Sequence, residues 1–377
     1  MKSIAYLSYY AQPGNPQKRA VTPAANTKID YICDRIIKNG YSVELISASG
    51  TCDTKKGYKG SRVKLKNGLF LKTFNTLPWN NLFQKITAKV ITNVGIIREL
   101  FKIKRGEKII AYHSLGYMRI VDILHKIKKF HLILEAEEIY ADVIGNEKLK
   151  KKEIKFLKSG DSYIFPTELL NKIINTKNKP AVIIHGTYKV EPEKEKIFSD
   201  NKIHIVYAGT FDPRKGGISA VLAAEFLPSN YHIHIIGFGS EQDTNNIKRC
   251  IDEISKQSKA TVTYDGIYSG EEYIKFIQSC DIGLSTQNPN ADFNATSFPS
   301  KILSYMANGL RVVSIRIPAI ETSAIGKYMY YYDEQTPKQI AKAIMSVDLS
   351  EPFDSRKIIK KLSNDFTKEL DLLLSTE

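Results

Sequence analysis

The chain has 377 residues, of which 42% are hydrophobic and 25% charged, and its formal net charge is +15. This is the composition of a globular protein; it excludes a disordered chain, a collagen-like fibre and a disulfide-knotted miniprotein. No apolar run reaches the 18 or so residues of a membrane-spanning helix. Met1–Tyr10 lacks a long apolar core and a cleavage site, so we interpret it as a first strand, not a signal peptide. Four widely spaced cysteines are expected to be free thiols in a reducing cytoplasm: Cys33, Cys52, Cys250 and Cys280.

The positive charge is confined to the first half of the chain. Residues 1–200 hold 36 basic and 19 acidic side chains, net +17, whereas residues 201–377 hold 19 and 21, net −2. This asymmetry indicates that the N-terminal half faces something anionic: nucleic acid, an acidic membrane surface or a pyrophosphate-linked acceptor. A solvated basic surface without a partner is the alternative.

Short apolar strands alternate with helical stretches in the first half. Asn26–Asn39 is expected to be a helix, with four isoleucines on one face and Gly40 as its stop. The expected strands are rich in Ile, Val and Tyr, as strands prefer. They are Ile4–Leu7, Val43–Ile46, Ile109–Tyr112, Leu132–Glu135, Tyr163–Phe165 and Val182–Ile184.

The second half repeats this alternation. Alternating strands and helices predict parallel sheets with right-handed crossovers, and ligands at the carboxyl ends of the strands. The charged stretch Lys189–Lys202 is expected to link two doubly wound α/β domains, residues 1–190 and 203–345. A helix over Ser355–Leu374 is expected to pack back on the first domain, within residues 355–377. The expected strands are Ile203–Ala208, Ile233–Ile236, Thr261–Tyr264, Ile282–Leu284 and Val312–Ser314.

Two motifs in the second half suggest anion binding. In Ala208–Gly217 a glycine-rich turn with Lys215 follows a strand, and a helical segment, Ser219–Phe226, comes next. Glycines allow the backbone to approach a ligand, and a helix start offers free N–H groups to a phosphate. In the second motif Thr296, Ser297 and Ser300 cluster at an expected helix start, with Pro299 in its first turn and Gly309 as its stop. Taken singly, each motif is also compatible with an ordinary strand-to-helix turn or capped helix.

Five motifs in order give these turns a more specific meaning. The Gly-Lys turn is followed by Gly237-Phe238-Gly239, Tyr264-Asp265-Gly266, Asp281–Ser285 and a block from Ser300 to Val313. Over about residues 203–345 this series resembles the C-terminal domain of family-4 glycosyltransferases of the GT-B fold. The resemblance implies an α/β protein of two Rossmann-like domains facing across a cleft, with a nucleotide-sugar donor on the second domain and no bound metal or other cofactor.

The resemblance also implies residue roles in the donor domain. Lys215 matches the lysine that holds the donor diphosphate, and the segment after Ser297 matches backbone amides that cradle the distal phosphate. The turn after Gly266 matches the segment that contacts the base. The expected diphosphate site is Arg214, Lys215, Ser297, Phe298, Ser300 and Lys301, and the expected nucleotide site is Gly209, Thr210, Gly266, Ile267, Tyr268 and Ser304.

Three positions depart from the family pattern. The usual pair of glutamates in the helix block is replaced by Thr296 and Ser304, of which Ser304 would bind the ribose by a shorter reach or not at all. Thr210 replaces an arginine, for which Arg214 is a candidate substitute. These changes leave open the donor identity, the retention of configuration and a catalytically degenerate homologue.

The first domain offers further candidates. Gly14 and Asn15 match the family's glycine loop beside the transferred sugar, and His113 loosely matches a histidine near it, although a strand-end histidine in ordinary hydrogen bonds is as good an account. In Glu135–Tyr140, clustered carboxylates raise one another's pKa, which suits Glu137 or Glu138 as a general base. An exposed acidic loop is the alternative.

The segment Trp79–Arg105 has the composition of an interfacial membrane helix. Apolar residues recur near helical spacing among six basic residues, and Glu99 is the only acid. Lys148–Lys158 adds six lysines against one glutamate, and such clusters attract anionic lipid. A buried amphipathic helix beside a solvated charge run is the competing account.

We therefore expect a glycosyltransferase at the cytoplasmic face of the cell membrane, held there peripherally. Its substrates would be a UDP-sugar, with galactose or galactofuranose as the first choice, and a polyprenyl-diphosphate-linked glycan of O-antigen, capsule or exopolysaccharide synthesis, with retention of configuration. The alternatives are a GT-B sugar-nucleotide epimerase and a degenerate homologue that binds lipid or nucleic acid. Nucleic acid is not expected as a partner, because the chain has no zinc spacing, RNP-type motif or basic recognition helix.

Overall fold

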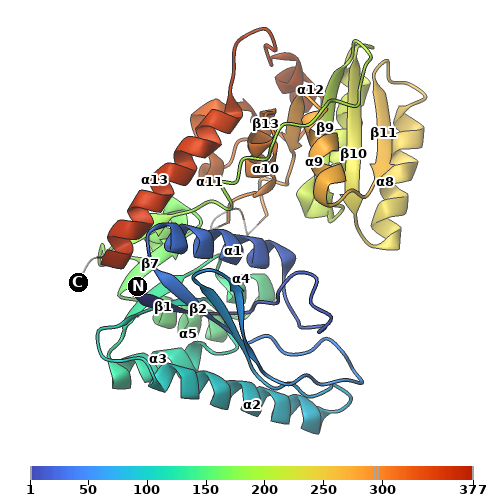
Figure 1. Ribbon diagram of the computed structural model, residues 1–377. Coiled ribbons are helices and arrows are strands. Elements are labelled where there is room, and N and C mark those ends of the chain that lie inside the picture. Colours follow the sequence, from blue (N-terminus) through green and yellow to red (C-terminus); the bar gives the residue numbers. More distant parts are fainter. Residues whose placement is uncertain (1, 292–293, 295–296, 376–377) are drawn as a thin grey trace. The chain divides into compact units, whose positions relative to one another are not determined.

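The computed structural model describes residues 2–291, 294 and 297–375, and the chain divides into two compact units (Figure 1). Unit 1 comprises Met1–Thr187 with Asp365–Glu377, and unit 2 comprises Tyr188–Asn364. Each unit is built on one twisted, mostly parallel sheet with helices on its faces, which is the two-domain α/β architecture expected from the alternating pattern.

Unit 1 has an eight-stranded sheet with the order β3-β4-β2-β1-β5-β6-β7-β8. All neighbouring strands are parallel except the hairpin of β3 and β4. The central strands are almost continuously apolar and buried, as expected for a sheet covered on both faces. The strands are β1 (Ser3–Ser8), β2 (Ser42–Ser47), β3 (Arg62–Lys66), β4 (Leu69–Thr73), β5 (Lys108–Tyr112), β6 (His131–Glu135), β7 (Ser162–Phe165) and β8 (Ala181–Ile183).

Helices cover both faces of this sheet (Figure 1). α1 (Pro23–Lys38) has Pro23 in its first turn and ends before Gly40, whose φ is +84°, so the expected glycine stop is confirmed. α2 (Leu82–Phe101), α3 (Met118–Lys128) and α5 (Glu147–Leu157) lie on the face opposite α1. The short helices α4 (Tyr140–Ile144) and α6 (Glu168–Ile174) complete the unit.

Unit 2 has a six-stranded parallel sheet with the order β11-β10-β9-β12-β13-β14. Chain order reverses between β9 and β12, which is where ligands bind in doubly wound folds. The strands are β9 (Ile203–Thr210), β10 (Tyr231–Phe238), β11 (Thr261–Gly266), β12 (Ile282–Ser285), β13 (Arg311–Ile315) and β14 (Met329–Tyr332). The helices are α7 (Gly217–Leu222), α8 (Glu241–Ile254), α9 (Gly270–Gln278), α10 (Lys301–Ala307), α11 (Pro318–Glu321) and α12 (Pro337–Met345), with the 3-10 turns η1 (Pro213–Lys215), η2 (Ala223–Phe226) and η4 (Gly326–Tyr328).

The final helix, α13 (Ser355–Ser375), begins in unit 2 and ends in unit 1. Its last part packs on unit 1: Phe366 stacks on Tyr31 with ring centroids 6.0 Å apart, and the amide of Asn39 donates to the carbonyl of Thr367 at 2.8 Å. The ammonium of Lys108 donates to the carbonyl of Leu374 at 2.8 Å, where a cation complements the negative end of the helix.

Three strands were not expected from the sequence. β3 and β4 form a hairpin at the edge of the sheet; β3 is basic and exposed and runs antiparallel to β4, whereas β4 buries Leu69 and Leu71. The third unexpected strand is β14, which consists of a methionine followed by three tyrosines. The stretch from Lys189 to Lys202, expected as a linker, belongs to unit 2, where the backbone N–H of Lys194 donates to Gln278 at 2.7 Å.

Candidate functional site

The carboxyl ends of three strands of unit 2 line a pocket of about 220 Å³. β9 and β10 end in register, with Gly209 opposite Gly237 and Thr210 opposite Phe238. The pocket therefore brings together four of the six residues expected to bind the nucleotide: Gly209, Thr210, Ile267 and Tyr268. It is also lined by Ala208, Ile236, Gly237, Phe238 and Tyr273.

Two glycines are required by the backbone around this pocket. A Cβ on Gly237, whose φ is +138°, would lie 1.8 Å from the carbonyl oxygen of Gly209. A Cβ on Gly216, whose φ is +79°, would lie 1.6 Å from the carbonyl oxygen of Thr286. Both positions combine a left-handed conformation with a backbone clash, so only glycine permits these turns.

The lysine turn is held in place by Tyr207 and Asp212. The carboxylate of Asp212 accepts the backbone N–H of Arg214 at 2.9 Å at the start of η1. The hydroxyl of Tyr207 lies within hydrogen-bond distance of two carbonyl oxygens, those of Thr210 at 2.9 Å and Lys215 at 3.1 Å. The strand end and the lysine turn therefore share one anchoring side chain.

Arg214 forms an ion pair within the same turn. Its guanidinium contacts the carboxylate of Asp212 at 2.6 Å, and the hydrogen bond from Arg214 lowers the pKa of Asp212. In this structure the guanidinium is thus engaged by Asp212. Its expected substitution for the arginine that Thr210 replaces stays a prediction.

The helix block begins later than expected. α10 starts at Lys301, so Pro299 lies in the turn before the helix and not in its first turn; the N–H of Ile302 donates to the carbonyl of Pro299 at 3.1 Å. Ser300 is the N-cap residue, but its side chain makes no capping hydrogen bond. The helix stop is confirmed, because Gly309 follows the C-cap with a φ of +96°. Phe298 is buried, and Thr296 lies outside the described residues.

Lys301 carries the most unusual group of the site. Its Nζ is buried, has no hydrogen-bond partner in the part of the chain that the structure describes, and lies 4.0 Å from the centroid of the Tyr207 ring. Burial, together with the charge of Lys215, lowers the pKa of Lys301 to about 7. A Cβ built on the pocket residue Gly209 would lie 3.2 Å from this nitrogen, so Lys301 adjoins the pocket floor.

The side chains expected at the nucleoside are also close to the pocket. The hydroxyl of Ser304 lies 3.1 Å from that of Tyr273, which lines the pocket and was not predicted from the sequence. Tyr268 stacks on Phe276 with ring centroids 4.6 Å apart, which fixes the turn after Gly266. Contact of Ser304 with a ribose remains a prediction.

A chain of buried histidines crosses the other end of this sheet. One nitrogen each of His204, His232 and His234 lies within 4.8 Å of the others. His204 Nδ1 and His234 Nε2 are 2.9 Å apart, whereas a metal bound linearly between two such nitrogens needs about 4 Å. The outer nitrogens contact Asp200 at 2.7 Å and Asp265 at 3.2 Å. His204 and His234 thus form a hydrogen-bonded chain between the two aspartates, and His232 stacks on His234 and contacts Thr263 at 2.9 Å.

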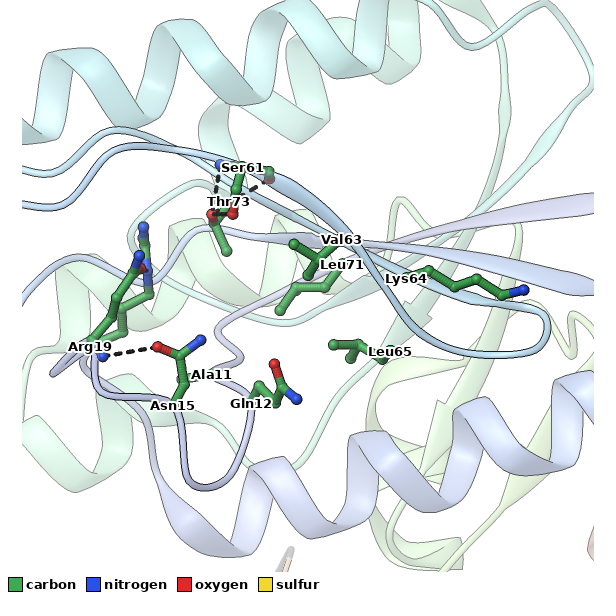
Figure 2. Close-up of a pocket in the computed structure, with 11 residues that line it drawn as sticks. Ala11, Gln12, Asn15, Arg19, Ser61, Val63, Lys64, Leu65, Leu71 and Thr73 are labelled. Atoms are coloured by element: carbon green, nitrogen blue, oxygen red, sulfur yellow. Dashed lines mark hydrogen bonds between the residues drawn. The ribbon is translucent and has the colours of Figure 1, made fainter.

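In unit 1, the loop after β1 borders a second, smaller pocket of about 120 Å³ (Figure 2). Asn15 and Gln12 line it on the loop side, and Lys64 lines it from β3. The buried guanidinium of Arg19 holds the loop by donating to the carbonyls of Ser49 and Phe74, each at 3.1 Å. Asn15 is thus placed at a cavity, whereas Gly14, with a φ of +74°, forms the turn beside it.

The carboxylates after β6 have distinct environments. Glu137 forms an ion pair with Lys28 at 2.5 Å, and Glu138 is half-buried. Glu135, the first carboxylate of the predicted cluster, is fully buried and accepts a hydrogen bond from Tyr6. Burial, with the nearby charge of Glu137, raises the pKa of Glu135 to about 7 against the opposing effect of Lys28. The general-base role of Glu137 or Glu138 stays a prediction.

His113 lies inside unit 1. Its ring is buried and stacks on Tyr140, with centroids 5.1 Å apart, and its Nε2 lies 3.3 Å from the carboxylate of Glu153. Burial lowers the pKa of His113 to about 4, so the ring is neutral near pH 7. The expected position of His113 near a donor sugar remains a prediction.

α2 exposes an apolar stripe. Ile96 and Leu100 pack inward, whereas Phe83 is 77% exposed. The competing account of a buried amphipathic helix is wrong for this stripe, which we call the α2 stripe and which consists of Trp79, Leu82, Phe83, Ile86, Val90, Val94 and Phe101. Within the described residues, no helix is long and apolar enough to cross a membrane.

Comparison with known proteins finds a family match within unit 2. Residues 202–347 match the family model described as glycosyl transferases group 1. This segment contains the pocket of unit 2, Lys215 and Lys301. The chain is accordingly a glycosyltransferase, and its two α/β units with parallel sheets are those of the GT-B fold. No curated protein matches the sequence significantly.

Solved structures resemble the chain over its whole length. Sucrose-phosphate synthase from Thermosynechococcus elongatus is 13% identical, with 99% and 98% of the two chains covered and a TM-score of 0.69. Anabaena HepE in complex with UDP is 13% identical, with full coverage of both chains and a TM-score of 0.67. An E. coli trehalose-6-phosphate protein bound to UDP-2-fluoro glucose is 12% identical, with 99% and 98% coverage and a TM-score of 0.66. At these identities the similarity establishes the fold of this glycosyltransferase.

Proposed function

We propose that this glycosyltransferase takes a sugar from a UDP-sugar bound in the pocket of unit 2. The observation that carries the proposal is the pocket itself, where strand-end glycines, the lysine turn and the start of α10 adjoin one another. Two of the similar structures hold UDP or a UDP-sugar analogue. We propose galactose or galactofuranose as the donor sugar; the support for this choice is the resemblance of the sequence to glycosyltransferases of polysaccharide synthesis.

The chemistry of the site suits departure of a nucleoside diphosphate. When the bond between the sugar and the diphosphate breaks, negative charge develops on the β-phosphate oxygen. Lys215 and the backbone N–H groups before α10 are groups that stabilise such charge from a fixed position. The turn of Ile267 and Tyr268, which is 65% exposed at Ile267, is proposed to take the base.

The proposed acceptor is a glycan linked to a polyprenyl diphosphate, bound by unit 1 at an anionic membrane surface. The excess of basic residues lies in this half of the chain. The α2 stripe is flanked by lysines, and the ammonium of Lys85 lies 5.8 Å from the Trp79 ring. An exposed apolar stripe among basic residues is the pattern of a helix that lies in a lipid interface. The small pocket beside Asn15 and Lys64 is a candidate contact for the acceptor.

Donor binding and transfer can be tested together. UDP is titrated calorimetrically into the wild type, Lys215→Ala and the matched control Lys338→Ala, whose lysine is exposed on α12. We expect Lys215→Ala to weaken UDP binding at least tenfold and the control to leave it unchanged. Radiolabelled UDP-galactose is then incubated with a bacterial lipid extract. Label in the lipid phase supports the acceptor, whereas epimerisation of free UDP-galactose without transfer contradicts it.

A further inference from the structure

We propose that Lys301 is a second cationic ligand of the donor diphosphate, and that the donor binds together with one proton taken up from solvent by this side chain. The inference rests on the proposed nucleotide-sugar donor. It deepens that proposal in two ways. It names a residue that becomes charged when the donor binds, and it predicts that donor binding at this site depends on pH.

The geometry shows a nitrogen prepared for an anion. Lys301 Nζ is buried and has no hydrogen-bond partner among the described residues, although an ammonium has three donors to satisfy. It makes a favourable contact with the face of Tyr207, whose ring centroid is 4.0 Å away. It lies beside Gly209, where the pocket floor has no side chain. A buried donor left unsatisfied is costly, and a phosphate oxygen in the pocket would satisfy it.

The surroundings of Lys301 contain no compensating charge within the part of the chain that the structure describes. Lys215 from η1 acts on the charge of Lys301, and the ring of Tyr207 from β9 lies beneath its Nζ; Tyr305 on the same helix interacts electrostatically with Tyr207 and with Tyr273 of α9. Burial raises the pKa of all three tyrosines, so they are neutral at pH 7 to 9. Among the described residues, the charged neighbour that acts on Lys301 is the cation Lys215, which disfavours the protonated form of Lys301.

These surroundings keep a large share of Lys301 neutral near pH 7, because its pKa is lowered to about 7 by burial and by Lys215. A diphosphate next to Nζ favours the charged form and raises this pKa. The neutral amine then accepts a proton from solvent and becomes the ammonium that pairs with a phosphate oxygen; no bond of the donor breaks. Since the bound state holds the extra proton, donor affinity falls by up to about tenfold per pH unit between the free and the bound pKa.

Proton uptake is measured by calorimetry of UDP binding at pH 8 in two buffers that differ in ionisation enthalpy, one of them an amine and the other not. At this pH the terminal phosphate of UDP, with a pKa of about 6, is already ionised and contributes little. We expect the wild type to take up about one proton per UDP. Lys301→Met, which is close in volume, should take up none and bind about tenfold more weakly at pH 7. Lys301→Arg, which is charged throughout, should bind without proton uptake and without pH dependence between pH 7 and 9.

The controls separate this inference from the proposed function. Lys338→Ala should take up protons as the wild type does, and the thermal unfolding midpoint of Lys301→Met should not fall, because the variant removes an unsatisfied buried amine. If UDP binds wild type and Lys301→Met equally, without proton uptake, the role of Lys301 is overturned while the donor site stands. If UDP does not bind the wild type at all, the donor proposal itself is overturned and this inference with it.

Discussion

Lys301 Nζ lies 4.0 Å from the ring centroid of Tyr207, and the hydroxyl of the same tyrosine lies 3.1 Å from the carbonyl oxygen of Lys215. One aromatic side chain thus supports a buried amine on its face and the lysine turn at its edge. The two cations of the proposed diphosphate site are therefore positioned through one side chain of β9.

Tyr207→Phe should loosen the lysine turn while keeping the ring beneath Lys301. The variant removes the hydrogen bond to the carbonyls of Thr210 and Lys215, which is worth about 1 kcal/mol. We expect UDP affinity to fall three- to tenfold in calorimetric titrations. Tyr231→Phe, at the amino end of β10, is the control and should bind UDP normally. Unchanged UDP affinity in Tyr207→Phe would refute the positioning role.

Gly237→Ala should destabilise unit 2 strongly. Its Cβ would lie 1.8 Å from the carbonyl oxygen of Gly209, so two strand ends must separate, and the φ of +138° adds strain. We expect a loss of more than about 2 kcal/mol in urea unfolding. Gly266→Ala is the matched control: its φ is +93°, but no atom lies within 4 Å of the added Cβ, so about 1 kcal/mol is expected. Equal losses would contradict the close approach of β9 and β10.

Glu135→Gln should stabilise the protein more as the pH rises. Burial raises the pKa of Glu135 from its ordinary 4.5 to about 7, so the folded state retains a proton that the unfolded state has released. Between these values the unfolded chain binds fewer protons, and the free energy of unfolding of the wild type falls with rising pH. The stability gain of Glu135→Gln, measured by urea unfolding, should thus be larger at pH 8 than at pH 5. A gain independent of pH would show that Glu135 does not titrate there.

Replacing two residues of the α2 stripe should impair membrane binding. In Phe83→Ser/Ile86→Ser, about 1.5–3 kcal/mol of burial per fully inserted side chain is lost, so affinity for phosphatidylglycerol vesicles should fall at least about tenfold. The control Ile197→Ser replaces an exposed isoleucine of unit 2. The exposed fraction of Ile197 is 45%, against 55% for Ile86. Wild-type binding should also weaken with salt, because lysines flank the stripe. Vesicle binding that is equal in both variants, or absent in the wild type, would contradict the membrane role.

Backbone-determined features of the donor domain could be predicted from the sequence. The turn around Lys215 and the stop at Gly309 follow from glycine positions and strand periodicity, which are local. The burial of Lys301 could not be predicted, because it depends on β9, α9 and α10 meeting in space. The same holds for Glu135, whose pKa is raised by burial, an effect opposed by Lys28 and Tyr6, which lie far away in the chain.

The misplaced elements have equally physical reasons. β3 lies at the sheet edge, where basic side chains interrupt the apolar pattern that marks a buried strand, and β4, which buries Leu69 and Leu71, follows it after a turn of two residues. The start of α10 was placed too early because Pro299 is favoured in a first helical turn, yet here it occupies the preceding tight turn. The histidine chain was missed because His204 and His232 become neighbours only through the pairing of β9 with β10.

The central claim is that the pocket of unit 2 binds the diphosphate of a UDP-sugar. The most direct test is a crystal structure of the protein with UDP. The account predicts the base against the turn of Ile267 and Tyr268, and phosphate oxygens within hydrogen-bond distance of Nζ of both Lys215 and Lys301. UDP bound away from this pocket, or a diphosphate that contacts neither lysine, would contradict it.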